Sequence, residues 1–466
     1  MPDALHSQPN SALRRVLGSS WAPIAVAVVV RMAFLLAGWG RFFAGDASGY
    51  ERLGDIWRLD GVYVGAWPPG VAWVIATVGN LFGHDAGMDV IRAGLVVTSA
   101  VICYCLMALA RRLAGRRAAC TAGWLYALHL PLVPSAHIVV SEQLQTALIL
   151  PALLLVWGLV RTHGWRMCGQ ASLAGALLGL AGLVRESVIL VLPGLVLWFF
   201  WRAGPRRGLL ASGYLGLSLL VVALPWATRN LHSTGRASIF GQSAGGIVAA
   251  GMNGFEPKFD VEDLRHRSET LPMGGLRNWL LEDPPQPWKA LRTGAHSIRS
   301  SDNIRQGFAF AFAEPSWFVR TRVLQQARAW SPLSMMVEYL RTESYGWPFD
   351  VRAVRGPLGI LALLQTTLLM AAACLGWERM SRARGARLLL LAVLASYAAS
   401  SLVLALTRYR VLLDTVLFIP AAVWLHERHA RTISKATQAV LICLLLLWII
   451  ELPWVIASVE SLWSPN

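Results

Sequence analysis

The sequence predicts an all-α integral membrane protein. Of its 466 residues, 55% are hydrophobic and only 15% are charged, whereas soluble domains are nearer a quarter charged. The mean hydropathy is +0.50, and the apolar residues are collected into separate runs that are long enough to span a bilayer. Lipid must therefore be the solvent for much of the chain.

The net charge of +16 does not indicate a nucleic-acid-binding protein. Most arginines stand in short runs between apolar segments, as in the cytoplasmic loops of membrane proteins. The six cysteines lie in or beside apolar stretches, and their spacing resembles no zinc or redox motif. We expect neither a disulfide framework nor a structural metal.

About eleven apolar runs are predicted to form transmembrane helices. The first, from about 21 to 40, follows Arg14 and Arg15 and lacks a small-residue cleavage site, so we expect it to be retained rather than removed as a signal peptide. The others cover about 89–110, 118–134, 139–160, 170–184, 186–201, 208–225, 354–377, 386–406, 410–426 and 436–456.

Five basic runs predict the topology. They are Arg111, Arg112, Arg116 and Arg117; Arg161 and Arg166; Arg202, Arg206 and Arg207; Arg379, Arg382, Arg384 and Arg387; and Arg428, Arg431 and Lys435. If all five are cytoplasmic, each interval between neighbouring runs contains an even number of crossings. The stretches 118–160 and 171–201 are then helical hairpins; one long kinked helix over 171–201 would put a basic run on the wrong side. The N-terminus is expected inside and the C-terminus outside.

This topology leaves two substantial extracytoplasmic segments. An N-terminal transmembrane module, 1–225, contains the first of them at about 41–88. The second covers 226–352 and is followed by the C-terminal transmembrane helices, 353–466.

The second outer segment contains one predicted amphipathic helix, from about Pro315 to Trp330. Helical spacing puts Val319, Val323 and Ala327 on one face with Trp330. Three arginines lie beside or opposite that face: Arg320, Arg322 and Arg328. Such a helix can lie on the bilayer surface or pack against the bundle.

Two carboxylates are candidates for chemistry at the outer membrane boundary. Asp46 follows the first helix and, four residues before Tyr50, shares a helical face with it. A carboxylate there can accept a proton from an acceptor hydroxyl or amine as a general base, although Asp46 can equally cap a short helix over 47–58. Glu142, at the outer turn of its hairpin, is either a second functional acid or a solvated turn residue.

Five arginines depart from the positive-inside pattern. Arg31 lies near the middle of the first helix, where a charge usually faces a buried partner or a water-filled cavity. The other four lie at predicted outer helix ends: Arg185, Arg229, Arg408 and Arg410. Arginines in such positions can bind a lipid phosphate through paired hydrogen bonds or simply anchor helices at the interface.

Taken together, these features resemble the bacterial branch of the GT-C glycosyltransferases. These are the protein-mannosyltransferase-like enzymes, which include the aminoarabinose transferase of lipid A. The resemblance rests on the order of short motifs over residues 22 to about 332, none of them specific alone. The motifs are Arg31; Asp46 with Tyr50; Pro68-Pro69-Gly70 entering an interfacial helix; Ser141-Glu142; Gly179 to Arg185; Pro225 to Asn230; Gly251-Met252-Asn253; and Glu314-Pro315 before a helix ending at Trp330-Ser331-Pro332.

The resemblance implies a GT-C-type bundle, a sugar donor on polyprenyl phosphate and a transfer that inverts the anomeric centre. It implies that Asp46 is the catalytic carboxylate and that Glu142 is a second acid near the reaction centre. The residues expected to bind substrate are Tyr50, Arg31, Arg185, Arg229, Arg408 and Arg410. Some relatives carry two neighbouring acids in the first loop, but Ala47 follows Asp46, so a divalent metal is compatible with the sequence without being indicated by it.

The expected location is the bacterial inner membrane, with the active site facing the periplasm or outside. The expected partners are the lipid-linked donor, an extracytoplasmic acceptor (lipid, glycan or protein) and the bilayer. A secondary transporter is an alternative, but it is expected to have repeated halves with paired broken helices. A catalytically silent scaffold of the same fold is another, and the presence of Asp46 argues against it.

Overall fold

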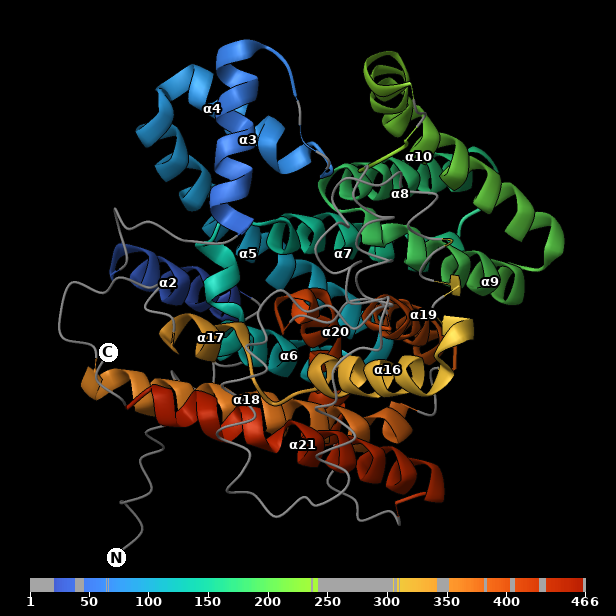
Figure 1. Cartoon of the computed structure of the whole chain (residues 1–466). Coiled ribbons are helices and arrows are strands. Elements are labelled where there is room, and N and C mark those ends of the chain that lie inside the picture. Colours follow the sequence, from blue (N-terminus) through green and yellow to red (C-terminus); the bar gives the residue numbers. More distant parts are fainter. Residues whose placement is uncertain are drawn as a thin grey trace, which may run out of the picture.

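The computed structural model describes residues 21–37, 46–63, 65, 67–235, 238–241, 305, 308–309, 311–341, 352–380, 384–402, 407–426 and 433–463, and all regular secondary structure in these ranges is helical. The α-helices are α2 (Ala22–Ala37), α3 (Asp46–Asp60), α4 (Gly70–Phe82), α5 (His84–Ala114), α6 (Arg116–Leu128), α7 (Ser141–Leu159), α8 (Gly164–Val184), α9 (Leu192–Ala203), α10 (Pro205–Thr234), α16 (Pro315–Ala329), α17 (Met335–Arg341), α18 (Arg352–Arg379), α19 (Arg384–Ser401), α20 (Val411–His426) and α21 (Lys435–Ser461). Short 3-10 segments are η1 (Leu130–Leu132), η2 (Pro134–Ala136), η3 (Glu186–Val191) and η6 (Thr407–Arg410). Figure 1 shows α3 and α4 together on one side of the bundle and α18 with α21 on the opposite side.

Each of the predicted apolar runs corresponds to a helix, but not all of these helices are of spanning length. Within the described residues, 8 helices are long and apolar enough to cross a membrane. They are α5, α7, α8, η3 with α9, α10, α18, η6 with α20, and α21. The predicted span over 118–134 is shorter than expected, because α6 ends at Leu128 and the prolines at 131 and 134 open two 3-10 turns instead. The prediction of about eleven spans is therefore met only in part.

The basic turns gather at one end of the bundle, as the predicted alternation of helices requires. Hydrogen bonds join the helix ends that carry them: Arg112 Nη1 to Leu154 O (2.9 Å), Arg207 Nη2 to Thr162 O (2.7 Å), Trp198 Nε1 to Gly385 O (2.9 Å) and Arg379 Nη1 to Trp424 O (3.0 Å). The ends of α7, α8 and α20 that carry Glu142, Arg185 and Arg408 lie at the other end. Which end faces the cytoplasm stays a prediction from the positive-inside rule.

Helices α8 and α10 pack closely and run in the same direction. A Cβ added to Gly175 would lie 2.1 Å from Leu215 O, and one added to Gly179 would lie 3.0 Å from Leu219 O. Since both contacts advance together along the two helices, α8 and α10 are parallel. The segment between them must cross back, so the structure contains the predicted reversal at Arg185, where α8 ends.

The first outer segment forms two packed helices. α3 begins at Asp46 and α4 begins at Gly70 directly after Pro69, so the predicted interfacial helix is present. A Cβ on Gly54 of α3 would lie 2.5 Å from Ile75 of α4, which shows how closely the two backbones approach. Helix α5 begins at His84, within the predicted range 41–88.

Helix α16 is present as predicted, but its buried side matches the predicted apolar face only in part, since Ala327 is fully buried. Val319 is 54% exposed, whereas Arg320 is 2% exposed. The helix packs on α19 and α21, where Gln326 Nε2 donates to Ser401 Oγ at 2.9 Å. Its neighbours offer polar acceptors, so polar side chains of α16 turn inward and the helix belongs to the bundle.

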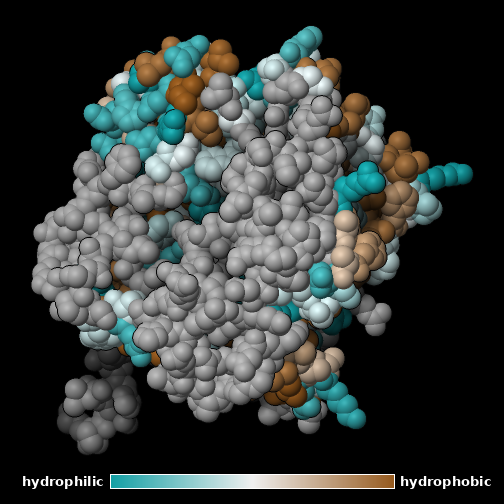
Figure 2. Space-filling view, viewed as in Figure 1, coloured by the Kyte–Doolittle hydropathy of each residue, from teal (hydrophilic) through white to brown (hydrophobic). Residues whose placement is uncertain are grey.

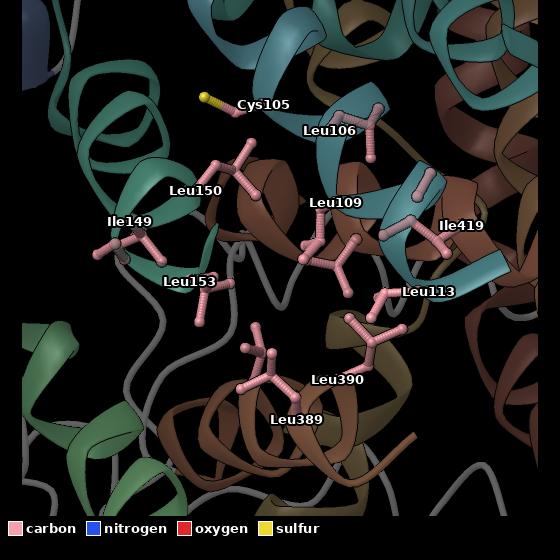
Figure 3. Packing of buried hydrophobic residues seen from close by; sticks show 14 of the residues in the cluster. Cys105, Leu106, Leu109, Leu113, Ile149, Leu150, Leu153, Leu389, Leu390 and Ile419 are labelled. Carbon is pink, nitrogen blue, oxygen red and sulfur yellow. The ribbon is translucent and has the colours of Figure 1, made fainter. Parts of the chain in front are cut away.

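The apolar core lies where α5, α7, α19 and α20 meet. Figure 3 shows leucines of α5 and α7 pointing toward Leu389 and Leu390 of α19 and Ile419 of α20. On the outside, large apolar side chains of α9 and α10 are exposed, and Figure 2 shows hydrophobic residues gathered at the margin where these helices lie. Such a band is expected of a surface that faces lipid.

Candidate active site

Four charged side chains meet at the end of the bundle opposite the basic turns. Asp46 is the first residue of α3, Glu142 lies in the first turn of α7, Arg185 follows the last residue of α8, and Arg408 lies in η6 before α20. We call these four residues the outer charge cluster. They come from distant parts of the sequence, and each lies at the end of a helical element.

The ends of α3, α7 and α8 stabilise the charged side chains that lie there. The amino end of an α-helix carries a partial positive charge and stabilises anions, whereas the carboxyl end stabilises cations. Asp46 and Glu142 lie at the amino ends of α3 and α7, and Arg185 lies at the carboxyl end of α8. The local backbone therefore supports three of the four charges before they meet.

The charges alternate along a chain of contacts. Arg185 Nη1 lies 2.7 Å from Glu142 Oε1. Arg408 Nε lies 3.4 Å from the same oxygen, and Arg408 Nη2 donates to Asp46 Oδ2. Glu142 is thus shared by two arginines, and Arg408 is shared by two carboxylates.

The four side chains differ in their access to solvent. The Glu142 side chain is 4% exposed and Arg408 is 14% exposed, whereas the Asp46 side chain is 43% exposed. A buried carboxylate needs charged or hydrogen-bonding partners, and Arg185 and Arg408 supply them. The alternative that Glu142 is a solvated turn residue is therefore wrong. Asp46 is the most exposed member of a largely buried cluster.

Tyr409 packs against both arginines of the cluster. The Arg185 guanidinium carbon lies 3.9 Å from the centre of the Tyr409 ring, and that of Arg408 lies 5.4 Å from it. Cation–π contacts of this kind restrict where a guanidinium can move. Tyr409 was not among the predicted site residues; its position between Arg408 and Arg410 is the signal in the sequence that points to it.

Tyr50 lies behind Asp46 on the same face of α3. Its side chain is buried, and burial, followed by the negative charge of Glu142, raises the pKa of Tyr50 to about 12. The ring also contacts Trp67, with 4.7 Å between the ring centroids. The Tyr50 hydroxyl therefore stays protonated near neutral pH.

His84 ties α3 to the start of α5. Its Nδ1 lies 2.9 Å from Asp55 Oδ1 and its Nε2 lies 3.1 Å from Glu51 Oε1. These contacts hold the middle of α3, the helix that begins with Asp46, against the transmembrane bundle. These contacts could not be predicted from the sequence, because one histidine and two acids in a predicted outer segment look like ordinary solvated residues.

Two of the predicted substrate-binding arginines lie inside the protein and away from the outer charge cluster. Arg31 is fully buried in α2 and donates to the carbonyls of Tyr126 and Ala127, at 3.3 and 3.5 Å. Arg410 is buried as well: it donates to the carbonyls of Ser331 and Leu333, and its Nε lies 3.4 Å from Asp414. Neither side chain is part of the candidate site.

Arg229 lies beside the site in an aromatic group. It donates to the carbonyl of Tyr63, and its guanidinium carbon lies 4.9 Å from the Trp226 ring centre. Trp57 of α3 lies 5.1 Å from Tyr63 and 6.1 Å from Trp226, measured between ring centroids. This group joins the end of α10 to α3, so Arg229 is close to α3 without belonging to the outer charge cluster.

No metal site accompanies the cluster in the part of the chain that the structure describes. Across those residues, no three or more His, Cys, Asp or Glu side chains are placed to hold a metal ion. The motif Gly251-Met252-Asn253 lies outside the described residues.

Comparison with solved structures shows which known membrane proteins have a similar fold. The chain is similar to the oligosaccharyltransferase AglB of Archaeoglobus fulgidus in complex with an inhibitory peptide and a dolichol-phosphate (TM-score 0.51, 14% identity, covering 96% of this chain and 56% of that chain). The apo form of the A. fulgidus oligosaccharyltransferase is similar to the same degree (TM-score 0.52, 14% identity, 98% and 57%). At this identity the likeness shows the fold alone, which is the GT-C fold, and the chain spans little more than half the length of that enzyme.

Sequence comparison matches one segment of the chain to a family model. Residues 66–230 match the family of dolichyl-phosphate-mannose-protein mannosyltransferases, so the resemblance inferred from the sequence is confirmed in this segment. The enzyme class expected from the sequence, a glycosyltransferase with a lipid-phosphate sugar donor, is the class of that family. The matched segment contains Glu142, Arg185 and Arg229, whereas Asp46 and Arg408 lie outside it.

Two other comparisons add little. ArnT from Cupriavidus metallidurans in the apo state matches with a TM-score of 0.38 and 18% identity, covering 87% of this chain and 76% of that chain, and this score does not by itself establish a shared fold. No curated protein matches the chain in sequence.

Proposed function

We propose that the protein is a membrane glycosyltransferase that takes a sugar from a polyprenyl-phosphate donor. The acceptor is an extracytoplasmic lipid, glycan or protein, and the transfer inverts the anomeric centre. The proposal draws on the family match of residues 66–230, the GT-C fold and the chemistry of the outer charge cluster. The site then faces the periplasm or outside of a bacterial inner membrane.

The observation that carries the proposal is the exposure of one acid at the edge of a buried pair of arginines. Asp46 has a 43% exposed side chain, whereas its partner Arg408 is largely buried. An acceptor hydroxyl or amine that approaches from the outer solution can reach this carboxylate. Asp46 then takes the acceptor proton as the new bond to the anomeric carbon forms.

The arginines act on the leaving group. Polyprenyl phosphate departs with an additional negative charge, and guanidinium groups held in place beforehand stabilise such charge as it develops. Arg185 and Arg408 both have their positions set by the buried carboxylate of Glu142. We assign Glu142 to this positioning, which keeps it near the reaction centre as a second acid.

The remaining predicted residues act on the sugar and on the shape of the site. Tyr50, whose hydroxyl stays protonated, can donate a hydrogen bond to a substrate oxygen. Trp57, Trp226 and Tyr63 surround the outer end of α10 beside Arg229. Indole and phenol rings of this kind stack on the apolar faces of sugars and still offer a polar atom.

A transfer assay tests the proposal. The purified protein in nanodiscs is given a panel of polyprenyl-phosphate sugars together with a membrane extract that supplies acceptors, and release of free polyprenyl phosphate is followed. We expect turnover by the wild type and a loss on the order of 10²–10⁴-fold in Asp46→Asn, the range for removal of a general base. Asp60→Asn, which removes an exposed carboxylate at the other end of α3, is the matched control and should keep full activity.

Two results would count against this assignment. Equal turnover by Asp46→Asn and the wild type would remove Asp46 from the mechanism while leaving the enzyme class intact. No turnover with any donor, from protein whose melting temperature shows that it is folded, would favour the silent scaffold.

A further inference from the structure

Arg408 has unused hydrogen-bonding capacity at the site. A guanidinium has five N–H donors, yet within the described residues Arg408 makes one hydrogen bond, to Asp46. Its Nε is buried without a hydrogen-bond partner, although Glu142 lies 3.4 Å away. The side chain is thus held in place by charge and by the Tyr409 ring, with donors to spare.

The two carboxylates around Arg408 differ in how readily they can release it. Glu142 is 4% exposed, and Arg185 Nη1 and Ser141 Oγ both contact its carboxylate, at 2.7 and 3.4 Å. Asp46 is much more exposed, so water can solvate its carboxylate after the contact with Arg408 breaks. Arg408, in contrast, is largely buried, and a buried cation needs an anion beside it.

From this asymmetry we propose that Asp46 and the donor phosphate compete for Arg408, so that Arg408 covers the base until the donor is bound. The inference rests on the proposed function and adds an order of events to it. Without donor, Arg408 occupies the carboxylate of Asp46. When the donor phosphate arrives, Arg408 turns to it about the fixed Glu142, and Asp46 becomes free to accept a proton.

The reaction balances with these groups alone. A bond forms between the acceptor oxygen or nitrogen and the anomeric carbon, and the bond between that carbon and the phosphate oxygen breaks. The acceptor proton goes to Asp46, and the bonding electron pair leaves with the phosphate, which Arg408 holds. When polyprenyl phosphate dissociates, Asp46 gives its proton to water and binds Arg408 again.

The competition predicts that removing the catalytic charge strengthens binding of the leaving group. The probe is a short-chain polyprenyl phosphate, and its Kd is measured in nanodiscs for the wild type, Asp46→Asn, Arg408→Gln and the double variant. We expect Asp46→Asn to bind about two- to fivefold more tightly than the wild type, the factor associated with a partly exposed ion pair. Arg408→Gln should bind more weakly, and Asp46→Asn should have no further effect in its background, because the two residues act as one unit.

Several outcomes overturn the inference. If Asp46→Asn leaves the Kd unchanged or raises it, there is no competition, although binding by the wild type still supports the donor class. If Asp46→Asn tightens binding equally in the Arg408→Gln background, the effect is a general loss of negative charge and not an exchange of partners. If the wild type does not bind polyprenyl phosphate at all, the proposed function itself fails.

Two further variants keep the test valid if a protein misfolds or if charge acts at a distance. Asp60→Asn removes one negative charge from the other end of α3 and should leave the Kd unchanged. If Arg408→Gln does not fold, Arg408→Lys keeps the cation, and Asp46→Asn should then still tighten binding. If Asp46→Asn does not lower the Kd for polyprenyl phosphate in the Arg408→Lys background, the proposed exchange of partners is contradicted.

Discussion

Arg408 and Arg410 are separated by a single residue, yet the structure uses them in opposite ways. Arg408 contacts two carboxylates, one of them open to solution, and its Nε has no hydrogen-bond partner among the described residues. Arg410 is fully buried and donates to the carbonyls of Ser331 and Leu333 beside Asp414. The same contrast separates the outer charge cluster from Arg31 in the interior.

The two kinds of arginine differ in the groups that accept their hydrogen bonds. The last carbonyls of a helix have no partner within that helix, and Arg31 donates to two of them, Tyr126 and Ala127, at the end of α6. Arg410 does the same for the turn that follows α16. An arginine that completes backbone hydrogen bonds inside a bundle is part of the fold, whereas one that pairs with an exposed carboxylate can change its partner for a ligand.

The largest effect on stability is expected from Arg410→Met. The variant leaves Asp414 and two carbonyls unpaired in the interior, and removing one member of a buried pair costs about 3–5 kcal/mol. Thermal denaturation in detergent should show a large drop in the melting temperature or a loss of folded protein. A wild-type melting temperature in Arg410→Met would erase the distinction drawn between the two arginines.

Arg408→Gln should show the reverse behaviour, with a large loss of rate and little loss of stability. Removing one preorganised donor to a developing anion lowers turnover by about 10²–10³-fold. The transfer assay measures this loss, and the melting temperature serves as the control. Were Arg408→Gln instead to melt like Arg410→Met, Arg408 would have to be assigned to the fold.

Gly376→Ala tests whether the position of α20, which follows Arg408, depends on helix packing. A Cβ at Gly376 would lie 1.8 Å from Pro420 O, so α18 and α20 must move apart, and overpacking of this kind costs about 1–3 kcal/mol. We expect a lower melting temperature together with weaker polyprenyl phosphate binding. Gly213→Ala on α10 is the matched control, since a Cβ there meets nothing within 4 Å; equal melting temperatures for the two variants would refute the packing argument.

The smallest effect is expected from His84→Gln. Glutamine can contact Asp55 or Glu51 but cannot bridge both in the geometry of the imidazole, and partly exposed ion pairs contribute about 0.2–1 kcal/mol. Hydrogen exchange of α3 amides should increase slightly while the transmembrane helices stay protected. Unchanged exchange in α3 would show that its contacts with α4 are sufficient to hold it.

The fold was largely predictable because hydrophobic runs and basic turns are local signals. The helices, the reversal at Arg185 and the start of α3 at Asp46 all follow from residues close together in the sequence. What could not be predicted depends on contacts between helices that are far apart in the sequence. The amphipathic pattern of α16 left open whether it lies on the bilayer or packs on the bundle, and it did not predict that Ser401 and Glu451 offer polar acceptors to that helix.

The candidate site was predictable in its members but not in its pairing. Helix-end acids and out-of-pattern arginines could be found as types, and Asp46, Glu142, Arg185 and Arg408 were among them. The pairing of Asp46 with Arg408 joins residues 362 positions apart, and no spacing in the sequence distinguishes Arg408 from Arg410. Only the packing of the helices decides that Arg408, and not Arg410, reaches Asp46 and Glu142.

The parallel pair α8 and α10 has a mechanical consequence. The two helices approach closely at Gly175, where a Cβ would meet Leu215 O, and at Gly179, where it would meet Leu219 O and the Val222 side chain. Arg185 follows the last residue of α8, and Arg229 lies near the carboxyl end of α10. A larger residue at either glycine would push the two helices apart and would therefore also shift these two cations relative to one another.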